Sequence, residues 1–232
     1  MRTQGNNDLI LESSNFGARL FELGWLEEAK TQFRYALDRL QVVQTRRSIT
    51  SITSSSSSSV STYISSSSEE QSSPKHPIRG WTRPLRKEDD QIFVYSRAVD
   101  LNPSFDIQQY PIYQTCIAYN LALTLHLIAL RKASSADYQT ASSLYEDSMK
   151  ALELAFDSCS CSDYLNDLRI VILNNAGHIY FSALVNYSAA SQCFQAVCGI
   201  AISDSTSSLP AEEVDRMVTN VLLTYSMTAP MA

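Results

Sequence analysis

One short phrase occurs four times in this chain of 232 residues. It consists of an asparagine, an apolar residue, a mostly small residue, two variable residues and then leucine or tyrosine. The four copies are NFGARL from Asn15, NLALTL from Asn120, NAGHIY from Asn175 and NVLLTY from Asn220. Self-similarity of this kind indicates a repeated unit, whose members bury their apolar faces only by stacking on one another.

The sequence around these phrases predicts an all-α protein, because apolar residues recur there at helical spacing. Gly24 permits a tight turn between two helices within residues 7–44. Pro111 and Pro210 predict helix starts, since a proline lacks an N–H where the first helical turn needs none. The other expected helices cover about 136–157 and 164–184, with one more from Tyr187. The chain is thus expected to hold three helix pairs and a terminal helix.

These pairs resemble the tetratricopeptide repeat. In that family the first helix carries a small residue with a large apolar one three positions on, and the second carries small, aromatic and small residues. The matching residues are Gly17, Leu20, Ala29, Phe33 and Ala36, then Ala122, Leu125, Ala141, Tyr145 and Ser148, then Gly177, Tyr180, Ala190, Phe194 and Val197. The resemblance implies a right-handed superhelix of antiparallel helix pairs with a concave groove, and a last helix that caps the array.

The repeats are irregularly spaced. The asparagines are 105, 55 and 45 residues apart, whereas a standard unit has about 34 residues. We attribute the first interval to a long insertion, and part of the second to an extended turn between Leu130 and Asp137.

The insertion divides the chain into four expected regions. Residues 1–44 form the first helix pair, 45–90 a disordered serine-rich and then basic loop, 91–110 an irregular or extended segment, and 111–232 the other two pairs with the capping helix. Fourteen residues between Ser51 and Ser73 are serine, and such a stretch cannot bury enough apolar surface to fold. Ser66, Ser67 and Ser73 are candidate phosphorylation sites, although an unmodified spacer is an equal alternative. Residues 91–101, QIFVYSRAVDL, are expected to pack against the body, in a helix or a strand.

The repeated asparagines are the candidate binding residues. In proteins of the tetratricopeptide type their position faces the groove, where an amide can both donate to and accept from a ligand backbone. Asn15, Asn120, Asn175 and Asn220 are therefore expected to contact a partner segment, with Tyr119, His126, His178 and Phe181 shaping the groove. The alternative is that each asparagine bonds only within its own helix pair.

Charge, cysteine spacing and the absence of known motifs limit the functions that the sequence predicts. With a net charge of −6, we expect no nucleic-acid partner. No signal peptide or transmembrane segment is expected, and five cysteines without a regular framework indicate a reducing compartment, cytoplasmic or nuclear. The chain has no phosphate-binding glycine motif, and neither its histidines nor its cysteines have the spacing of a metal site. We expect no cofactor, no metal and no catalytic residue.

The sequence therefore predicts a non-catalytic adaptor that holds a protein or peptide partner in the groove of a helical array. One alternative is a structural or self-associating subunit, which would associate through the apolar helix 111–131. A second is an enzyme with an unrecognised site near His126 and His178.

Overall fold

A computed structural model describes the protein at residues 2–54, 78–82, 92–102, 109–158, 162–203 and 207–228. Within these ranges the chain is mostly helical, with seven helices and two short strands. In chain order they are α1 (Arg2–Glu22), α2 (Leu26–Ser54), β1 (Ile78–Trp81), β2 (Val99–Leu101), α3 (Tyr110–Lys132), α4 (Ser135–Ser158), α5 (Ser162–Ser182), α6 (Tyr187–Ser203) and α7 (Ala211–Thr228).

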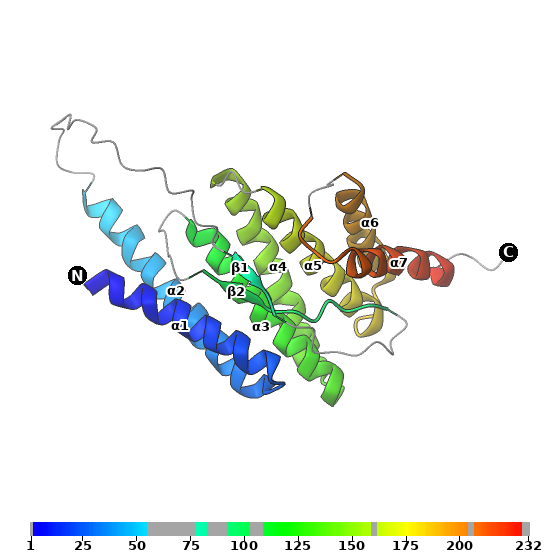
Figure 1. The fold of residues 1–232 in the computed structure, drawn as a ribbon, viewed down its shortest axis with the longest axis horizontal. Helices are drawn as coiled ribbons and strands as arrows, with labels where there is room; N and C mark the ends of the chain where they lie inside the picture. Colours follow the sequence, from blue (N-terminus) through cyan, green and yellow to red (C-terminus); the bar gives the residue numbers. More distant parts are fainter. Residues whose placement is uncertain are drawn as a thin grey trace.

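Consecutive helices pack as antiparallel pairs, α1 with α2, α3 with α4 and α5 with α6, and α7 packs on α6. In Figure 1 the pairs follow one another from α1 and α2 at the left to α6 and α7 at the right. Each pair turns through one residue of positive φ, which is Gly24 (81°), Ala133 (52°) or Val185 (51°). Only the first of these turns carries the glycine that such a backbone conformation favours.

Two expected boundaries are wrong. α3 ends at Lys132 and α4 begins at Ser135, so no extended turn separates them. The wider spacing of the asparagines comes instead from the helices themselves, which have 23 and 24 residues. α2 continues to Ser54 and so enters the region expected to be a disordered loop, because a packed helix adds further turns at little cost. The serine-rich residues 55–77 lie outside the described ranges.

α3 is the central helix of the core. All but a few of its residues are buried, and its apolar residues surround the helix rather than forming a stripe. It has the length and composition of a membrane-spanning helix, but 94% of its most apolar stretch is buried inside the protein. That burial is typical of a core helix.

The small residues of the repeats allow close helix approach. A Cβ atom added to Gly17 would lie 2.9 Å from the ring of Phe33, and one added to Gly177 would lie 2.7 Å from the ring of Phe194. Both rings are fully buried. The first and third helix pairs therefore use the same contact, a glycine of one helix against a phenylalanine of the next.

An extended segment, residues 92–102, crosses the helices. Figure 1 shows it running from the α6–α7 end of the protein towards α1 and α2. Its last part forms β2, which pairs antiparallel with β1. The all-α expectation is thus corrected by a small two-stranded sheet, which forms because an extended chain offers its second edge to another strand. β1 also lies within the range 45–90 that was expected to be a loop.

Gly177→Ala tests the repeated contact. The added methyl group must displace the buried ring of Phe194, and we expect a loss of about 1–3 kcal/mol in the free energy of unfolding. Gly199→Ala is the matched control, because it is also helical but has nothing within 4 Å of an added Cβ. It should stabilise by about 0.5–1 kcal/mol. Equal effects of the two changes in urea denaturation would contradict the packing.

Candidate functional site

The four repeated asparagines come together on the extended segment. Each side chain binds both backbone groups of a single residue: its Oδ1 accepts from the N–H, and its Nδ2 donates to the C=O. The pairs are Asn15 with Leu101, Asn120 with Val99, Asn175 with Tyr95 and Asn220 with Phe93. All these distances lie between 2.7 and 3.0 Å. We call this set of side chains the asparagine ladder.

The geometry of the ladder follows from the period of an extended chain. Alternate residues of a strand present their N–H and C=O groups to the same edge, and the four bound residues are all odd-numbered. The amide of asparagine has one donor and one acceptor side by side, so it matches one such residue. The asparagines come from the alternate helices α1, α3, α5 and α7. These four helices therefore bind one edge of a single extended chain.

The ladder is buried over most of its length. Asn120 and Asn175 are fully buried and Asn220 nearly so, whereas Asn15 at the other end is half-buried. Asn174 joins the α7 end, because its Nδ2 donates to the C=O of Phe93 at 3.1 Å and its Oδ1 accepts from Asn220 at 2.7 Å. Water cannot replace these partners in the buried part, so each amide satisfies groups that would otherwise be unpaired.

Residue 97 lies in the same register but has no asparagine. The hydroxyl of Tyr119 donates to its carbonyl at 3.0 Å instead. The side chain of Arg97 reaches α7, where Nε and Nη2 donate to Oε1 of Glu213 at 2.9 and 2.7 Å. On the other edge of the segment, Thr82 binds both backbone groups of Ala98. The segment is therefore bound along both edges from Ala98 to its last strand residue, Leu101.

Aromatic side chains cover the segment. The ring of Trp81 meets Tyr95 and Tyr119 edge-on, with centroids 5.3 and 6.1 Å apart, and Tyr119 lies 6.2 Å from Tyr145. Burial raises the pKa of Tyr95, Tyr119 and Tyr145, so all three are neutral phenols at physiological pH. Tyr119, one of the expected groove residues, thus contacts the segment through its hydroxyl, while its ring packs on Trp81 and Tyr145.

The two candidate histidines form a buried pair. Nε2 of His126 and Nδ1 of His178 are 3.0 Å apart. The other ring nitrogen of His126 lies 3.4 Å from the hydroxyl of Tyr145, and that of His178 lies 3.4 Å from Ser182 Oγ. The imidazoles are 0% and 4% exposed. They therefore connect α3, α4 and α5, and the described contacts occupy each ring nitrogen.

Phe181 lies at the far end of the candidate site. Its ring meets Tyr187 at 5.2 Å, and it packs at the edge of a small cluster that contains Ile92 and Phe194. The candidate phosphorylation sites Ser66, Ser67 and Ser73 lie outside the described residues, as do Cys159 and Cys161. Among the residues that the structure describes, no three His, Cys, Asp or Glu side chains are grouped as a metal site would require.

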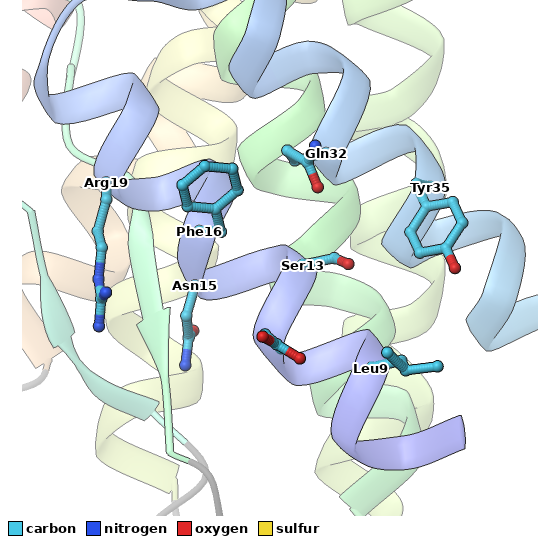
Figure 2. A pocket seen from close by; sticks show the side chains of 8 residues that line it. Leu9, Ser13, Asn15, Phe16, Arg19, Gln32 and Tyr35 are labelled. Carbon is cyan, nitrogen blue, oxygen red and sulfur yellow. The ribbon is translucent and has the colours of Figure 1, made fainter. Parts of the chain in front are cut away.

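A hollow of about 640 Å³ lies on the first helix pair, next to the α1 end of the ladder, since Asn15 is among its lining residues. Figure 2 shows Asn15 and Arg19 of α1 pointing towards the strands, and Gln32 and Tyr35 projecting from α2. The lining residues are Leu9, Glu12, Ser13, Asn15, Phe16, Arg19, Gln32 and Tyr35. Phe16 is 49% exposed there.

Sequence reasoning missed Glu213, which belongs to an ordinary acidic first turn. Asn174 lies at an expected groove position, but its bond to Asn220 was not expected, because it precedes the repeated phrase and is not part of it. The sequence carries one further repeated feature of the ladder, a threonine four residues after Asn120 and after Asn220. The hydroxyls of Thr124 and Thr224 each donate to the backbone carbonyl of the asparagine one turn earlier.

No family model matches the chain, and no curated protein or solved structure is detectably similar to it.

Asn120→Ala tests the energetic role of the ladder. It leaves the buried N–H and C=O of Val99 without partners, and we expect a loss of about 2–5 kcal/mol in the free energy of unfolding. Asn15→Ala removes the same contacts at the half-buried end, where water can replace them, and should cost about 1 kcal/mol or less. Urea denaturation of both variants gives the comparison. A loss at Asn120 no larger than that at Asn15 would contradict the buried ladder.

Proposed function

We propose that this protein is a non-catalytic adaptor of the tetratricopeptide type, whose asparagine ladder receives an extended segment of a partner protein. The observation that carries the proposal is the bidentate binding of backbone groups by four side chains from four helices. Such contacts do not depend on the side chains of the bound segment. The backbone contacts of such a surface supply affinity, as in peptide recognition by strand addition, while pockets for the side chains select the segment.

The repeated packing supports the tetratricopeptide type. The same glycine–phenylalanine contact recurs in the first and third pairs, where the resemblance expects a small residue to face an aromatic one. The pairs also follow one another in chain order, as they do in a stacked array.

In this proposal residues 92–102 act as an intramolecular ligand, which a partner exchanges. A tethered segment competes at an effective concentration on the order of millimolar. A partner therefore has to bind the ladder more tightly than the chain's own segment does, or arrive through a second contact. Because of this competition, residues 92–102 would occupy the ladder whenever no suitable partner is present.

Peptide complementation of a Tyr95→Ala chain tests the proposal. The change removes a fully buried ring from the segment and should destabilise the chain by about 3–5 kcal/mol. A synthetic peptide with the sequence of residues 92–101 carries the missing ring. We expect it to raise the Tm of this variant, and to raise that of the wild-type chain much less.

The matched control is the Tyr95→Ala chain with Asn175→Ala added, which loses the amide that binds residue 95. The same peptide should raise its Tm less, because the incoming backbone has lost its partner. An unchanged Tm for the folded Tyr95→Ala chain at peptide concentrations above the effective concentration of the tether would refute exchange at the ladder.

A second candidate function, assembly with other chains, is favoured by the apolar residues exposed on the first helix pair. Phe16, Leu23 and Trp25 are 49%, 66% and 58% exposed. Terminal repeats of an array ordinarily have a polar outer face. The apolar helix α3, by contrast, is buried in the core, which makes it an unsuitable surface for association.

Light scattering coupled to size-exclusion chromatography tests the assembly function. If the first helix pair mediates association, the wild-type chain should be larger than a monomer, and Phe16→Asp should shift it towards the monomer without changing its helicity. A monomeric wild-type chain at high concentration would exclude self-assembly through this face.

The described contacts of the histidine pair support a structural role. A catalytic base has to reach its substrate, whereas His126 and His178 are buried and bond to each other. We therefore propose that the pair connects helices and that the enzyme alternative is the weaker one.

A further inference from the structure

α7 contacts both the backbone and the side chains of the extended segment. Asn220 of α7 binds the backbone of Phe93, as the other asparagines bind theirs. Two further residues of α7, Glu213 and Arg216, contact side chains of the segment. Glu213, Arg216 and Asn220 follow one another at intervals of three and four residues along α7, and this spacing places them on one face of the helix.

The first of these side-chain contacts recognises a positive charge. Both Nε and Nη2 of Arg97 donate to a single oxygen, Oε1 of Glu213, at 2.9 and 2.7 Å. The side chains are 23% and 13% exposed, so water screens the ion pair only in part. The second oxygen, Oε2, is buried and has no hydrogen-bond partner within the described part of the chain. Glu213 therefore has acceptor capacity that an arginine could use more fully, by a bidentate contact.

The second side-chain contact recognises an aromatic ring. The guanidinium carbon of Arg216 lies 4.3 Å from the centroid of the Phe93 ring, within the range of a cation–π contact. Residues 93 and 97 are four apart and both lie in the ladder register. α7 thus contacts an aromatic residue and, four positions later, an arginine.

We propose that the partner of this protein supplies an extended segment with an aromatic residue four positions before an arginine, and that Glu213 and Arg216 recognise these two side chains. This inference rests on the proposed exchange of the segment at the ladder. Asparagines of α1, α3 and α5 then bind the backbone of the segment without regard to side chains, whereas Glu213 and Arg216 of α7 discriminate between side chains at positions 93 and 97. The preferred ligand carries its own positive charge at the position that faces Glu213.

The test uses the full chain with Arg97→Ala, whose own segment has lost its contact with Glu213. The probe is a fluorescent peptide with the sequence of residues 92–101. A charged hydrogen-bonded pair of this kind contributes about tenfold to a hundredfold in binding. We expect the peptide to bind the Arg97→Ala chain tighter than the wild-type chain by about that factor, because the tethered competitor is weaker.

Two altered peptides separate the side-chain contacts. Replacing the arginine of the peptide by alanine should weaken binding to the Arg97→Ala chain by about tenfold to a hundredfold. Replacing its first aromatic residue by alanine should weaken binding about threefold or more. With Glu213→Gln added to the chain, the arginine and alanine peptides should differ much less. A charge reversal gives the converse test. A chain with Glu213→Arg should bind the peptide that has glutamate in place of arginine better than it binds the unaltered peptide.

Failure of side-chain recognition by Glu213 and failure of exchange at the ladder give different results. If both the arginine and the alanine peptide bind the Arg97→Ala chain equally, recognition by Glu213 is wrong while exchange at the ladder stands. If neither peptide binds this chain and Tyr95→Ala also shows no complementation, the proposed function itself fails. Should the Arg97→Ala chain not fold alone, the helicity that each peptide restores gives the same comparison, and equal restoration by both peptides would overturn the inference.

Discussion

The binding of one extended chain by four asparagines is the contact on which the rest of this structure depends. Residues 92–102 cross the helices with a backbone edge that faces their side chains, and a buried N–H or C=O without a partner is costly. β1 pairs only with the last residues of the segment, Val99–Leu101, along the edge opposite the asparagines. The asparagines supply the missing partners, and for this reason the segment can lie in the interior without belonging to a larger sheet.

The same contact joins parts of the protein that are distant along the chain. Phe93 bonds to α7, 127 residues away, and Leu101 bonds to α1, 86 residues away in the other direction. Helix pairs in a stacked array contact only their neighbours, whereas this segment connects the first helix to the last. We infer that the segment and the array stabilise each other, and that release of the segment loosens the arrangement of the alternate helices. That coupling would let a bound partner affect the whole molecule.

Much of the helical structure could be predicted, because its causes are local in the sequence. Helical spacing and the two prolines placed the boundaries of α3, α4 and α5, and the starts of α6 and α7, within two residues, and Gly24 marked a turn. The equivalent turns at Ala133 and Val185 carry no glycine, so the extended turn expected near Ala133 was wrong. The asparagines were singled out as amides that bind the backbone of a partner, and in the structure they bind the backbone of the chain's own extended segment. The sequence could not show that the bound backbone belongs to the same chain. No local pattern pairs Asn220 with Phe93 or Glu213 with Arg97.

Amide hydrogen exchange, followed residue by residue by NMR in the intact protein, tests the ladder most directly. The amide protons of Phe93, Tyr95, Val99 and Leu101 donate to asparagine oxygens and should exchange far more slowly than those of an unfolded chain. In the Asn175→Ala protein, the protection of Tyr95 should fall more than that of Leu101, which a different helix binds. Exchange of all four protons at the rate of an unfolded chain would contradict the ladder. So would an unchanged rate for Tyr95 after the loss of Asn175.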